Sequence, residues 1–277
     1  MIGSLTDTAT LHNGPKMPWL GFGTFQLTGA TAEEAVGWAL DLGYRSIDTA
    51  AVYQNEVEVG AAIRGSGVDR QEIFLTSKVW NTDQGYDATM SAFDASLERL
   101  GTDYADLYLV HWPVEGMFKD TWRALEDLYD AGRVRAIGVS NFLTHHLRDL
   151  LDGARVVPMI NQVEFHPRLQ QPDLQAFCED HEIRLEAWRP IMKGGVLEIP
   201  ELVELGEALG KSAVQVTLRW MVQKGVIAIP RSSQPKHVEA NADIFDFELT
   251  PEQMEIVDDL DRDMRTGEDP DNFDFGS

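Results

Sequence analysis

Short apolar runs alternate with longer amphipathic runs from one end of the chain to the other. The apolar runs lack the alternation of half-exposed strands, which is typical of strands covered on both faces. We therefore predict eight buried strands, at Leu20–Thr24, Tyr44–Asp48, Ile73–Val79, Ala105–His111, Val134–Val139, Met159–Gln162, Ile183–Trp188 and Val226–Ile229.

The amphipathic runs between these strands predict helices, and several carry end signals. Thr31 and Glu34 have the spacing of a capping box, as do Thr250 and Gln253 on either side of Pro251. Glycine ends the other runs, as is common after a helix. The predicted helices are Thr31–Gly43, Lys119–Ala131, Glu201–Leu209 and Ala213–Lys224, with a late helix that begins at Thr250.

Strands and helices that alternate over the whole length predict an α/β fold. Eight such units favour a closed (β/α)8 TIM barrel over an open sheet. The turn pair Asn13-Gly14 predicts an N-terminal β-hairpin within Thr10–Pro18 that closes the bottom of the barrel. No linker or repeat divides residues 1–277, so we predict one domain with short loops at the barrel mouth.

The charge of the chain excludes several classes of partner. Lys and Arg number 23 and Asp and Glu 46, so the formal net charge is −23. Nucleic acids and anionic membranes call for a basic face, so we expect neither as a partner. Adaptation to high salt and an arginine-rich coding bias both remain open as explanations of the acidity. The acidic tail, Asp258–Ser277, is predicted to be exposed, with Phe273 and Phe275 docked on the barrel.

Cysteine usage and the N-terminus indicate the compartment. The single cysteine, Cys178, cannot form an internal disulfide, and we expect it to be buried on a helix. The first residues have neither the basic nor the apolar region of a signal peptide, and no apolar run reaches the roughly 20 residues of a membrane span. These features predict a cytoplasmic protein. We expect a monomer, because no long apolar stripe is left over once the barrel faces are assigned.

Polar residues stand at the carboxyl ends of seven successive predicted strands. In a parallel barrel the carboxyl ends of the strands meet at the mouth, where the site of a barrel enzyme lies. One polar strand end is usually a satisfied core group, but seven that converge favour a site. They are Asp48, Lys78, His111, Ser140 with Asn141, Gln162, Trp188 with Arg189, and Arg231 with Ser232.

Four of these positions suggest acid catalysis at a carbonyl. A tyrosine hydroxyl such as that of Tyr53 is a poor acid at neutral pH, and a nearby ammonium lowers its pKa. Lys78 supplies an ammonium, and Asp48 would hold it as an ion pair. His111 would orient the carbonyl oxygen by a hydrogen bond. None of the four supplies a reductant, so the site needs a hydride donor.

Other chemistries lack their motifs. Gly21 and Gly23 are not part of a G-x-G-x-x-G sequence, because Gln26 stands at the third glycine, and there is no phosphate-binding P-loop motif. The metal-binding H-E-x-x-H pattern is absent as well, so no metal site is predicted. His145 and His146 are adjacent on a predicted helix, where we expect them to point apart at the surface.

These residues lie in stretches that resemble the aldo-keto reductase family over about residues 10–265. Within it, the prokaryotic branch that contains diketogluconate and glyoxal reductases is the most similar. The matching stretches are LGFGT (20–24), GYRSIDTAAVYQNEVEVGAAI (43–63), LTSKVW (75–80), RLGTDYADLYLVHWP (99–113), GRVRAIGVSNF (132–142), NQVEFHP (161–167) and IPRSSQPKHVEANADIFDFELT (229–250).

The resemblance implies a role for each matching residue. Tyr53 would be the general acid, with Asp48, Lys78 and His111 completing the catalytic tetrad. The nicotinamide carboxamide would be held by Ser140, Asn141 and Gln162, with Trp188 stacked on the ring. The remaining implied contacts are Arg231 and Ser232 with the 2′-phosphate of NADPH, Asn241 with adenine, and Phe25, Trp80, His111 and Trp112 with the substrate.

Two departures from the family pattern bear on the cofactor. Arg189 stands where serine is common, and we expect it to contact the cofactor. His237 stands where an arginine usually clamps the 2′-phosphate, and a neutral histidine is the weaker phosphate ligand. Arg231 and Lys236 remain nearby, and together with Lys78 and Arg189 they predict a local positive patch in a negative shell.

The sequence therefore predicts NADPH-dependent reduction of aldehydes or ketones, with secondary use of NADH. The aromatic residues favour small or flat aldehydes, α-dicarbonyls or keto sugars. The alternative is a non-catalytic relative that binds NADP(H) as a sensor or structural subunit. A barrel isomerase or metal hydrolase is less well supported, because neither explains the 231–241 segment.

The histidine at position 237 generates a prediction about cofactor preference. NADPH should be preferred while NADH use remains measurable, and His237→Arg should widen the gap, because a guanidinium binds phosphate bidentately. The measurement is kcat/KM with both cofactors. A higher value with NADH than with NADPH in the unaltered protein would overturn this ordering.

Overall fold

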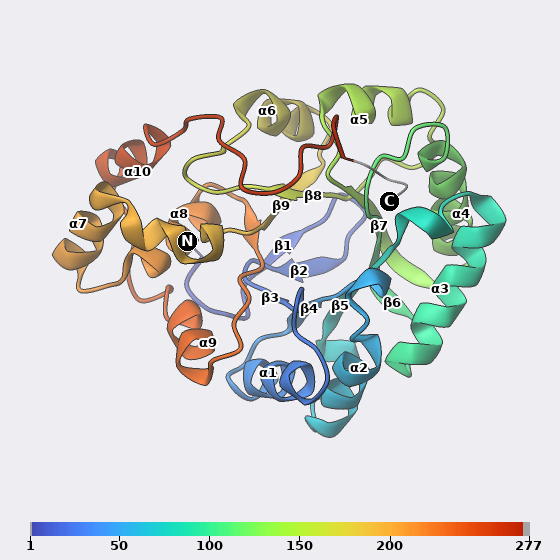
Figure 1. Cartoon of the computed structure of the whole chain (residues 1–277), viewed down its shortest axis with the longest axis horizontal. Coiled ribbons are helices and arrows are strands. Elements are labelled where there is room, and N and C mark those ends of the chain that lie inside the picture. The colour runs from blue at the N-terminus through green and yellow to red at the C-terminus, as the bar shows by residue number, and fades with distance from the viewer. Residues whose placement is uncertain (1, 274–277) are drawn as a thin grey trace.

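The computed structural model describes residues 2–273 and shows a ring of parallel strands surrounded by helices (Figure 1). Eight strands pair in chain order from β3 to β10. A parallel bridge between Leu20 and Ala228 then joins the two ends of the sheet, with Gly21 N donating to Ala228 O at 2.9 Å. The predicted (β/α)8 barrel is confirmed.

The elements follow the predicted alternation. The barrel strands are β3 (Phe22–Gly23), β4 (Ser46–Asp48), β5 (Phe74–Val79), β6 (Ala105–Val110), β7 (Val134–Ser140), β8 (Ile160–Glu164), β9 (Arg184–Trp188) and β10 (Ile227–Ala228). The helices are α1 (Ala30–Asp41), α2 (Glu56–Gly65), α3 (Tyr86–Leu100), α4 (Phe118–Asp130), α5 (Thr144–Leu151), α6 (Pro172–Asp180), α7 (Pro200–Leu209), α8 (Ala213–Gln223), α9 (Pro235–Ala242) and α10 (Pro251–Asp258). Short 3-10 turns are η1 (Ala51–Tyr53), η2 (Arg70–Glu72), η3 (Asn81–Asp83) and η4 (Met192–Glu198).

The N-terminal hairpin closes the bottom of the barrel, as predicted. Its strands, β1 (Thr8–Thr10) and β2 (Lys16–Pro18), pair antiparallel. At its turn Asn13 Nδ2 donates to Arg135 O at 3.0 Å, at the start of β7. The hairpin therefore covers the amino ends of the strands and leaves their carboxyl ends at the opposite side.

The capping signals were only partly correct. Thr250 and Gln253 form the predicted capping box of α10. The predicted box at Thr31 is wrong: α1 begins one residue earlier, after Gly29, and no side chain caps it. Thr31 then lies inside the first turn, where its hydroxyl cannot act as the cap.

Cys178 is buried on α6, as predicted. Burial raises the pKa of its thiol to about 12, so it is present as the unreactive protonated form at neutral pH. Among residues 2–273 no helix is both long enough and apolar enough to span a membrane.

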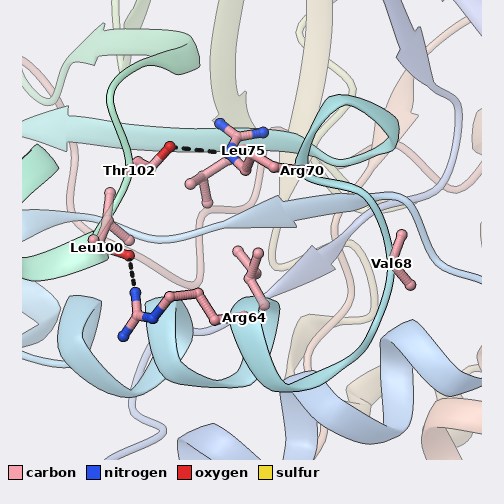
Figure 2. A pocket seen from close by; sticks show the side chains of 8 residues that line it. Arg64, Val68, Arg70, Leu75, Leu100 and Thr102 are labelled. Atoms are coloured by element: carbon pink, nitrogen blue, oxygen red, sulfur yellow. Dashed lines mark hydrogen bonds between the residues drawn. The ribbon is translucent and has the colours of Figure 1, made fainter.

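A small cavity of about 110 Å³ lies beside α2 and the end of α3, away from the strand ends at the mouth (Figure 2). Its two arginines already have protein partners. Arg64 Nη1 donates to Leu100 O at 2.6 Å, and Arg70 Nε donates to Thr102 Oγ1 at 3.2 Å. These bonds tie α2 and η2 to the end of α3 and the residues just after it, so the cavity is a packing feature.

The contact between α2 and α3 predicts a sharp difference between two helical glycines. A Cβ at Gly60 would lie 2.1 Å from Leu100 O, whereas a Cβ at Gly37 in α1 would meet nothing within 4 Å. Gly60→Ala should lower the free energy of unfolding by about 1–3 kcal/mol or more, because the two helices must separate. Gly37→Ala should raise it by about 0.5–1 kcal/mol, because alanine loses less backbone entropy on folding. Urea unfolding measures both, and equal effects would contradict the packing argument.

Candidate functional site

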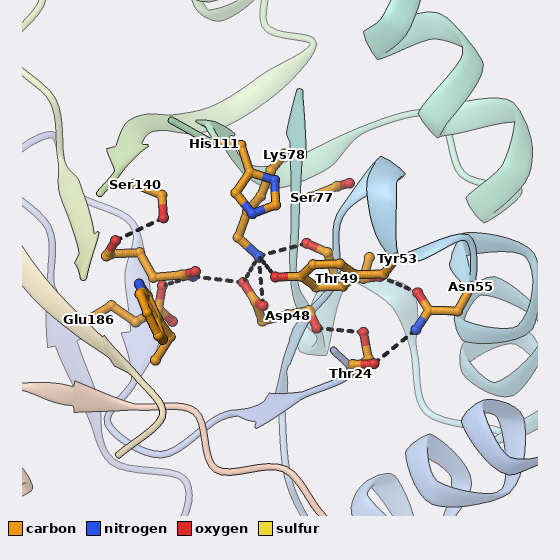
Figure 3. Close-up of polar contacts among 12 residues, drawn as sticks. Thr24, Asp48, Thr49, Tyr53, Asn55, Ser77, Lys78, His111, Ser140 and Glu186 are labelled. Atoms are coloured by element: carbon orange, nitrogen blue, oxygen red, sulfur yellow. Dashed lines mark hydrogen bonds and ion pairs between the residues drawn. The ribbon is translucent and has the colours of Figure 1, made fainter. Parts of the chain in front are cut away.

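A buried lysine stands at the centre of the strand ends. Lys78 lies in β5 and is fully buried. Its Nζ donates to both carboxylate oxygens of Asp48, at 2.7 and 2.8 Å, and to Thr49 O at 2.9 Å (Figure 3). The Tyr53 hydroxyl lies 3.3 Å from the same nitrogen. The predicted ion pair and its contact with the tyrosine are thus both present.

A second network, which the sequence analysis missed, positions the tyrosine. Tyr53 ends η1, and Asn55 lies buried two residues later. Asn55 Nδ2 donates to Thr24 O at 2.9 Å and to Leu27 O at 2.8 Å, while its Oδ1 accepts from Thr49 Oγ1 at 2.7 Å. These bonds tie the η1 loop to the chain after β3 and to the end of β4. Only an asparagine next to an otherwise apolar loop hinted at this in the sequence.

The pKa of Tyr53 moves opposite to the sequence-based expectation. Burial of the hydroxyl raises the pKa of Tyr53, and the Lys78 ammonium offsets only part of that increase. Burial alone would lower the pKa of Lys78, but Asp48 and Tyr53 outweigh burial and raise it. The pair is therefore a neutral phenol beside a charged ammonium, which is the form that donates a proton.

His111 completes the cluster as a neutral imidazole. Burial, and then the charge of Lys78, lower the pKa of His111 well below its usual 6.5. Its ring packs edge-on against Tyr53 at 5.8 Å and against Trp80 at 5.1 Å. Its Nδ1 is buried with no hydrogen-bond partner within residues 2–273. A neutral ring keeps both a donor and an acceptor nitrogen for a ligand.

The residues that the resemblance assigns to the substrate surround this cluster. Phe25 is 45% exposed, and its ring lies 5.1 Å from that of Tyr53. Trp112, the residue after His111, stacks on Phe273 with ring centroids 4.2 Å apart. The predicted docking of Phe273 is confirmed, and Phe275 lies outside the described residues.

The four residues expected at the nicotinamide are linked to one another. Ser140 Oγ donates to Gln162 O at 2.8 Å, and Asn141 Nδ2 donates to His111 O at 2.9 Å. Trp188 Nε1 donates to Asn141 Oδ1 at 2.8 Å. Asn141 has a φ of 66°, in the left-handed region that asparagine tolerates. The ends of β7, β8 and β9 thus form one polar surface beside the acid cluster.

Glu186 is the principal site residue that the sequence analysis missed. It lies fully buried in β9, and Gln162 Nε2 donates both to its Oε2 and to Asp48 Oδ2, each at 2.8 Å. Burial, and then the negative charge of Asp48, raise the pKa of Glu186 to about 8. Its position two residues before a strand end gave the only signal, because that spacing places it on the same strand face as Trp188.

The C-terminal segment crosses the mouth from α10 toward α5 (Figure 1). The buried carboxylate of Glu164 accepts from Thr266 N at 2.8 Å, from Gly267 N at 3.1 Å and from the Thr266 hydroxyl. Arg189 donates to Thr266 O and lies over the Trp188 ring. The arginine that we assigned to the cofactor thus has a partner in this segment.

The predicted phosphate-binding residues lie around the start of α9. Arg231, half-buried, donates to Gln26 Oε1 at 3.1 Å, and Ser232 Oγ accepts from Gln234 N at 3.0 Å. Lys236 and His237 are exposed in the first turn of α9, whereas Asn241 is buried near its end. Lys78 does not belong to the positive patch that we predicted, because it is buried and paired with Asp48.

The two adjacent histidines of α5 do not point apart, contrary to expectation. The rings of His145 and His146 are 4.0 Å apart, and both approach Asp271, at 3.0 and 3.5 Å. Such a trio has the residue types of a metal site. However, His146 Nδ1 accepts from Leu143 N at the start of the helix, which leaves the proton of the neutral ring on Nε2, the atom that faces Asp271.

The comparisons with known proteins agree with this geometry. The sequence profile of the Aldo/keto reductase family matches residues 19–262. The chain therefore belongs to the aldo/keto reductase family, a family of oxidoreductases.

Individual relatives cover nearly the whole chain. Glyoxal reductase of Bacillus subtilis is 55% identical over 98% of this chain and 99% of its own. The 9,11-endoperoxide prostaglandin H2 reductase of Trypanosoma cruzi is 49% identical over 96% of each chain. Among solved structures, an aldo-keto reductase from a Medee basin deep-sea metagenome library has a TM-score of 0.94 at 42% identity, over 96% of this chain and 100% of its own. A mutant of Gox0644 in complex with NADPH has a TM-score of 0.93 at 42% identity, over 96% and 98%.

The hydrogen bonds that Glu164 accepts generate a prediction about how the C-terminal segment is held. Although burial opposes it, hydrogen bonds from His166 and Thr266 lower the pKa of Glu164 to about 2, below its ordinary 4.5. A lowered pKa means that the carboxylate stabilises the docked segment at neutral pH and loses this effect as the pH falls from about 4.5 toward 2. Glu164→Gln should weaken the docking by about 1–3 kcal/mol, because charge-assisted bonds are lost.

The measurement is the rate of trypsin cleavage at Arg265, which lies beside the anchor. Glu126→Gln is the matched control. Glu126 is another buried carboxylate, in α4, and it accepts hydrogen bonds from two backbone amides, those of Arg155 and Val156. Cleavage should accelerate in the Glu164 variant alone. Equal rates in both variants would show that the anchor does not hold the segment.

Proposed function

We propose that the protein reduces aldehydes or ketones to alcohols with NADPH, with Tyr53 as the general acid. The observation that carries this proposal is the buried Lys78 ammonium, which contacts the Asp48 carboxylate and the Tyr53 hydroxyl at once. A phenol held against an ammonium suits proton donation to an oxyanion, because the charge of the phenolate that remains is balanced.

The polar groups of the mouth fit a nicotinamide cofactor. Among residues 2–273, only Trp188 donates to Asn141 Oδ1, which leaves that oxygen a lone pair for an amide donor. No residue of this range donates to Gln162 Oε1. The carboxamide of a nicotinamide offers that donor. Ser140, Asn141, Gln162 and Trp188 would hold this end of the cofactor. The 2′-phosphate and adenine would bind at Arg231, Ser232, His237 and Asn241.

When bound, NADPH supplies the hydride that the side chains of this site lack. Addition of hydride to a carbonyl carbon leaves negative charge on the carbonyl oxygen. Neutral His111 donates a hydrogen bond to that oxygen, and Tyr53 transfers its proton to it. Lys78 stabilises the resulting phenolate, and Asp48 holds the ammonium in place.

The substrate class follows from the aromatic residues and from one relative. Phe25 packs beside Tyr53 and Trp80 beside His111, and Trp112 follows His111 in the chain. Flat apolar rings at this position suit small or planar carbonyl compounds. Glyoxal, the substrate in the name of the Bacillus subtilis relative, is such an α-dicarbonyl. We therefore propose small aldehydes, α-dicarbonyls or keto sugars.

The preference for NADPH over NADH rests on Arg231 and on Lys236 beside the start of α9. Arg231 has no acidic partner within residues 2–273, so its charge is available to a phosphate. The Gox0644 neighbour, which was solved with NADPH, supports the same choice. Arg189 would contribute to cofactor binding only after its hydrogen bond to Thr266 O is broken.

The alternative function is a sensor or structural subunit that binds NADP(H) without turnover. The cluster of Asp48, Tyr53, Lys78 and His111 argues against it, because a protein that only binds cofactor gains nothing from the cost of a buried ion pair. Consumption of NADPH after addition of a carbonyl compound separates the two functions. A panel of carbonyls in the same assay identifies the substrate class.

The role of Tyr53 predicts a specific loss of activity. Tyr53→Phe should lower kcat/KM for carbonyl reduction by about 100-fold to 10,000-fold or more, because only the hydroxyl proton is removed. The Kd of NADPH should stay close to the wild-type value. Tyr129→Phe is the matched control, since the Tyr129 hydroxyl accepts from Asn13 at the bottom of the barrel. Retained turnover in Tyr53→Phe would remove this residue from its role.

A further inference from the structure

Glu186 is a buried acid without a cation of its own. It faces Gln162 directly across the parallel pair of β8 and β9. Its Oε2 accepts from Gln162 Nε2, and its Oε1 is buried with no partner within residues 2–273. No arginine, lysine or histidine among residues 2–273 forms an ion pair with Glu186. A buried carboxylate without a cation lowers the free energy of unfolding, so a role in packing alone does not account for an acid at position 186.

The hydrogen bonds of Glu186 restrict how the Gln162 amide is oriented. The two N–H bonds of Gln162 Nε2 point at two carboxylates, those of Glu186 and Asp48. A flipped amide would place its oxygen against both acids, which is unfavourable. Gln162 can therefore present only its oxygen to a ligand. That oxygen matches the N–H donors of a nicotinamide carboxamide.

The charge of Glu186 also acts on the redox state of a ligand in the mouth. Asp48 and Lys78 form a pair with no net charge, so an ionised Glu186 leaves one excess negative charge inside the barrel. The nicotinamide ring is cationic when oxidised and neutral when reduced. A negative charge in a medium of low dielectric constant stabilises the cationic form more than the neutral one.

We propose that Glu186 is a positioning residue of the reductase: it orients the Gln162 amide and, when ionised, favours binding of the oxidised over the reduced nicotinamide. The inference rests on the proposed function, because it assumes that the nicotinamide binds beside Gln162. It implies that Glu186 assists hydride loss from the reduced cofactor.

The surroundings of Glu186 determine at which pH this charge appears. Across the barrel it faces Asp48 from β4, Lys78 from β5 and Tyr53 from η1. On β8 it faces the uncharged Gln162, and on β10 it pairs with the apolar Ile227. Helix α6 packs against β9, but none of its residues acts on the pKa of Glu186. Burial and Asp48 keep Glu186 protonated in mild acid, so its charge develops between about pH 7 and pH 9, around its pKa of about 8.

The experiment measures the Kd of NADP+ and of NADPH by quenching of tryptophan fluorescence at pH 6 and pH 9. The informative quantity is the ratio of the two constants, because the phosphates are common to both forms and cancel. The unaltered protein should favour NADP+ about 5- to 20-fold more at pH 9 than at pH 6, the scale of one charge–charge coupling inside a protein. Glu186→Gln should show the pH 6 ratio at both pH values.

Two further variants sharpen the result. Glu126→Gln removes a different buried carboxylate, in α4, and should keep the pH dependence of the unaltered protein. Glu186→Ala removes the acceptor as well as the charge, so it should weaken both cofactor forms relative to Glu186→Gln. Equal weakening of both forms in Glu186→Gln, at both pH values, would reveal a structural role and overturn the proposal.

The outcomes separate this inference from the proposed function. If the unaltered protein binds both cofactor forms and reduces carbonyls, yet its Kd ratio does not change with pH, only the role of Glu186 fails. If it binds neither form, the proposed function fails. The pH dependence of the unaltered protein tests the inference even if Glu186→Gln does not fold.

Discussion

The buried ion pair between Lys78 and Asp48 is the interaction on which the rest of the site depends. A lysine at this depth stays charged only because two carboxylate oxygens and a backbone carbonyl surround its nitrogen. Burial lowers the pKa of His111, and the Lys78 charge lowers it further. The same charge partly offsets the effect of burial on the pKa of Tyr53. Asp48 also accepts from Gln162, which brings Glu186 into the same network. One pair thus connects Tyr53, the proposed acid, and His111, the proposed hydrogen-bond donor, with the proposed nicotinamide site.

The mouth of the barrel is completed by a segment far away in the chain. Glu164 at the end of β8 receives the backbone amides of Thr266 and Gly267, and Phe273 lies on Trp112. Most of this segment is exposed, and its docking depends on a few anchors rather than on a large apolar surface. The acidic segment is held at this position because the Glu164 carboxylate accepts hydrogen bonds from its backbone amides.

Much of the site was predictable because a parallel barrel brings strand ends together. Asp48, Lys78 and His111 follow or end apolar strands, so periodicity alone placed them at one mouth. The direction of the pKa of Tyr53 was not predictable, because it depends on how far burial outweighs one ammonium at 3.3 Å. Glu186 was missed because it lies inside a predicted strand, where an isolated acid is indistinguishable from a residue on the outer face. His145 and His146 were placed wrongly because their contact depends on Asp271, more than a hundred residues away.

The sequence by itself determined the barrel, its order of strands and the family to which the chain belongs, because hydrophobic periodicity and long motifs are local properties. Local patterns also identified the candidate acid and its ammonium. Only the tertiary structure decided which atoms meet. Gln162 donates to two carboxylates, Arg189 donates to Thr266 O, and Lys78 pairs with Asp48 in the interior and so is not part of the predicted positive patch. Those contacts join segments distant in sequence, and their energies depend on burial and separation, which no local pattern encodes.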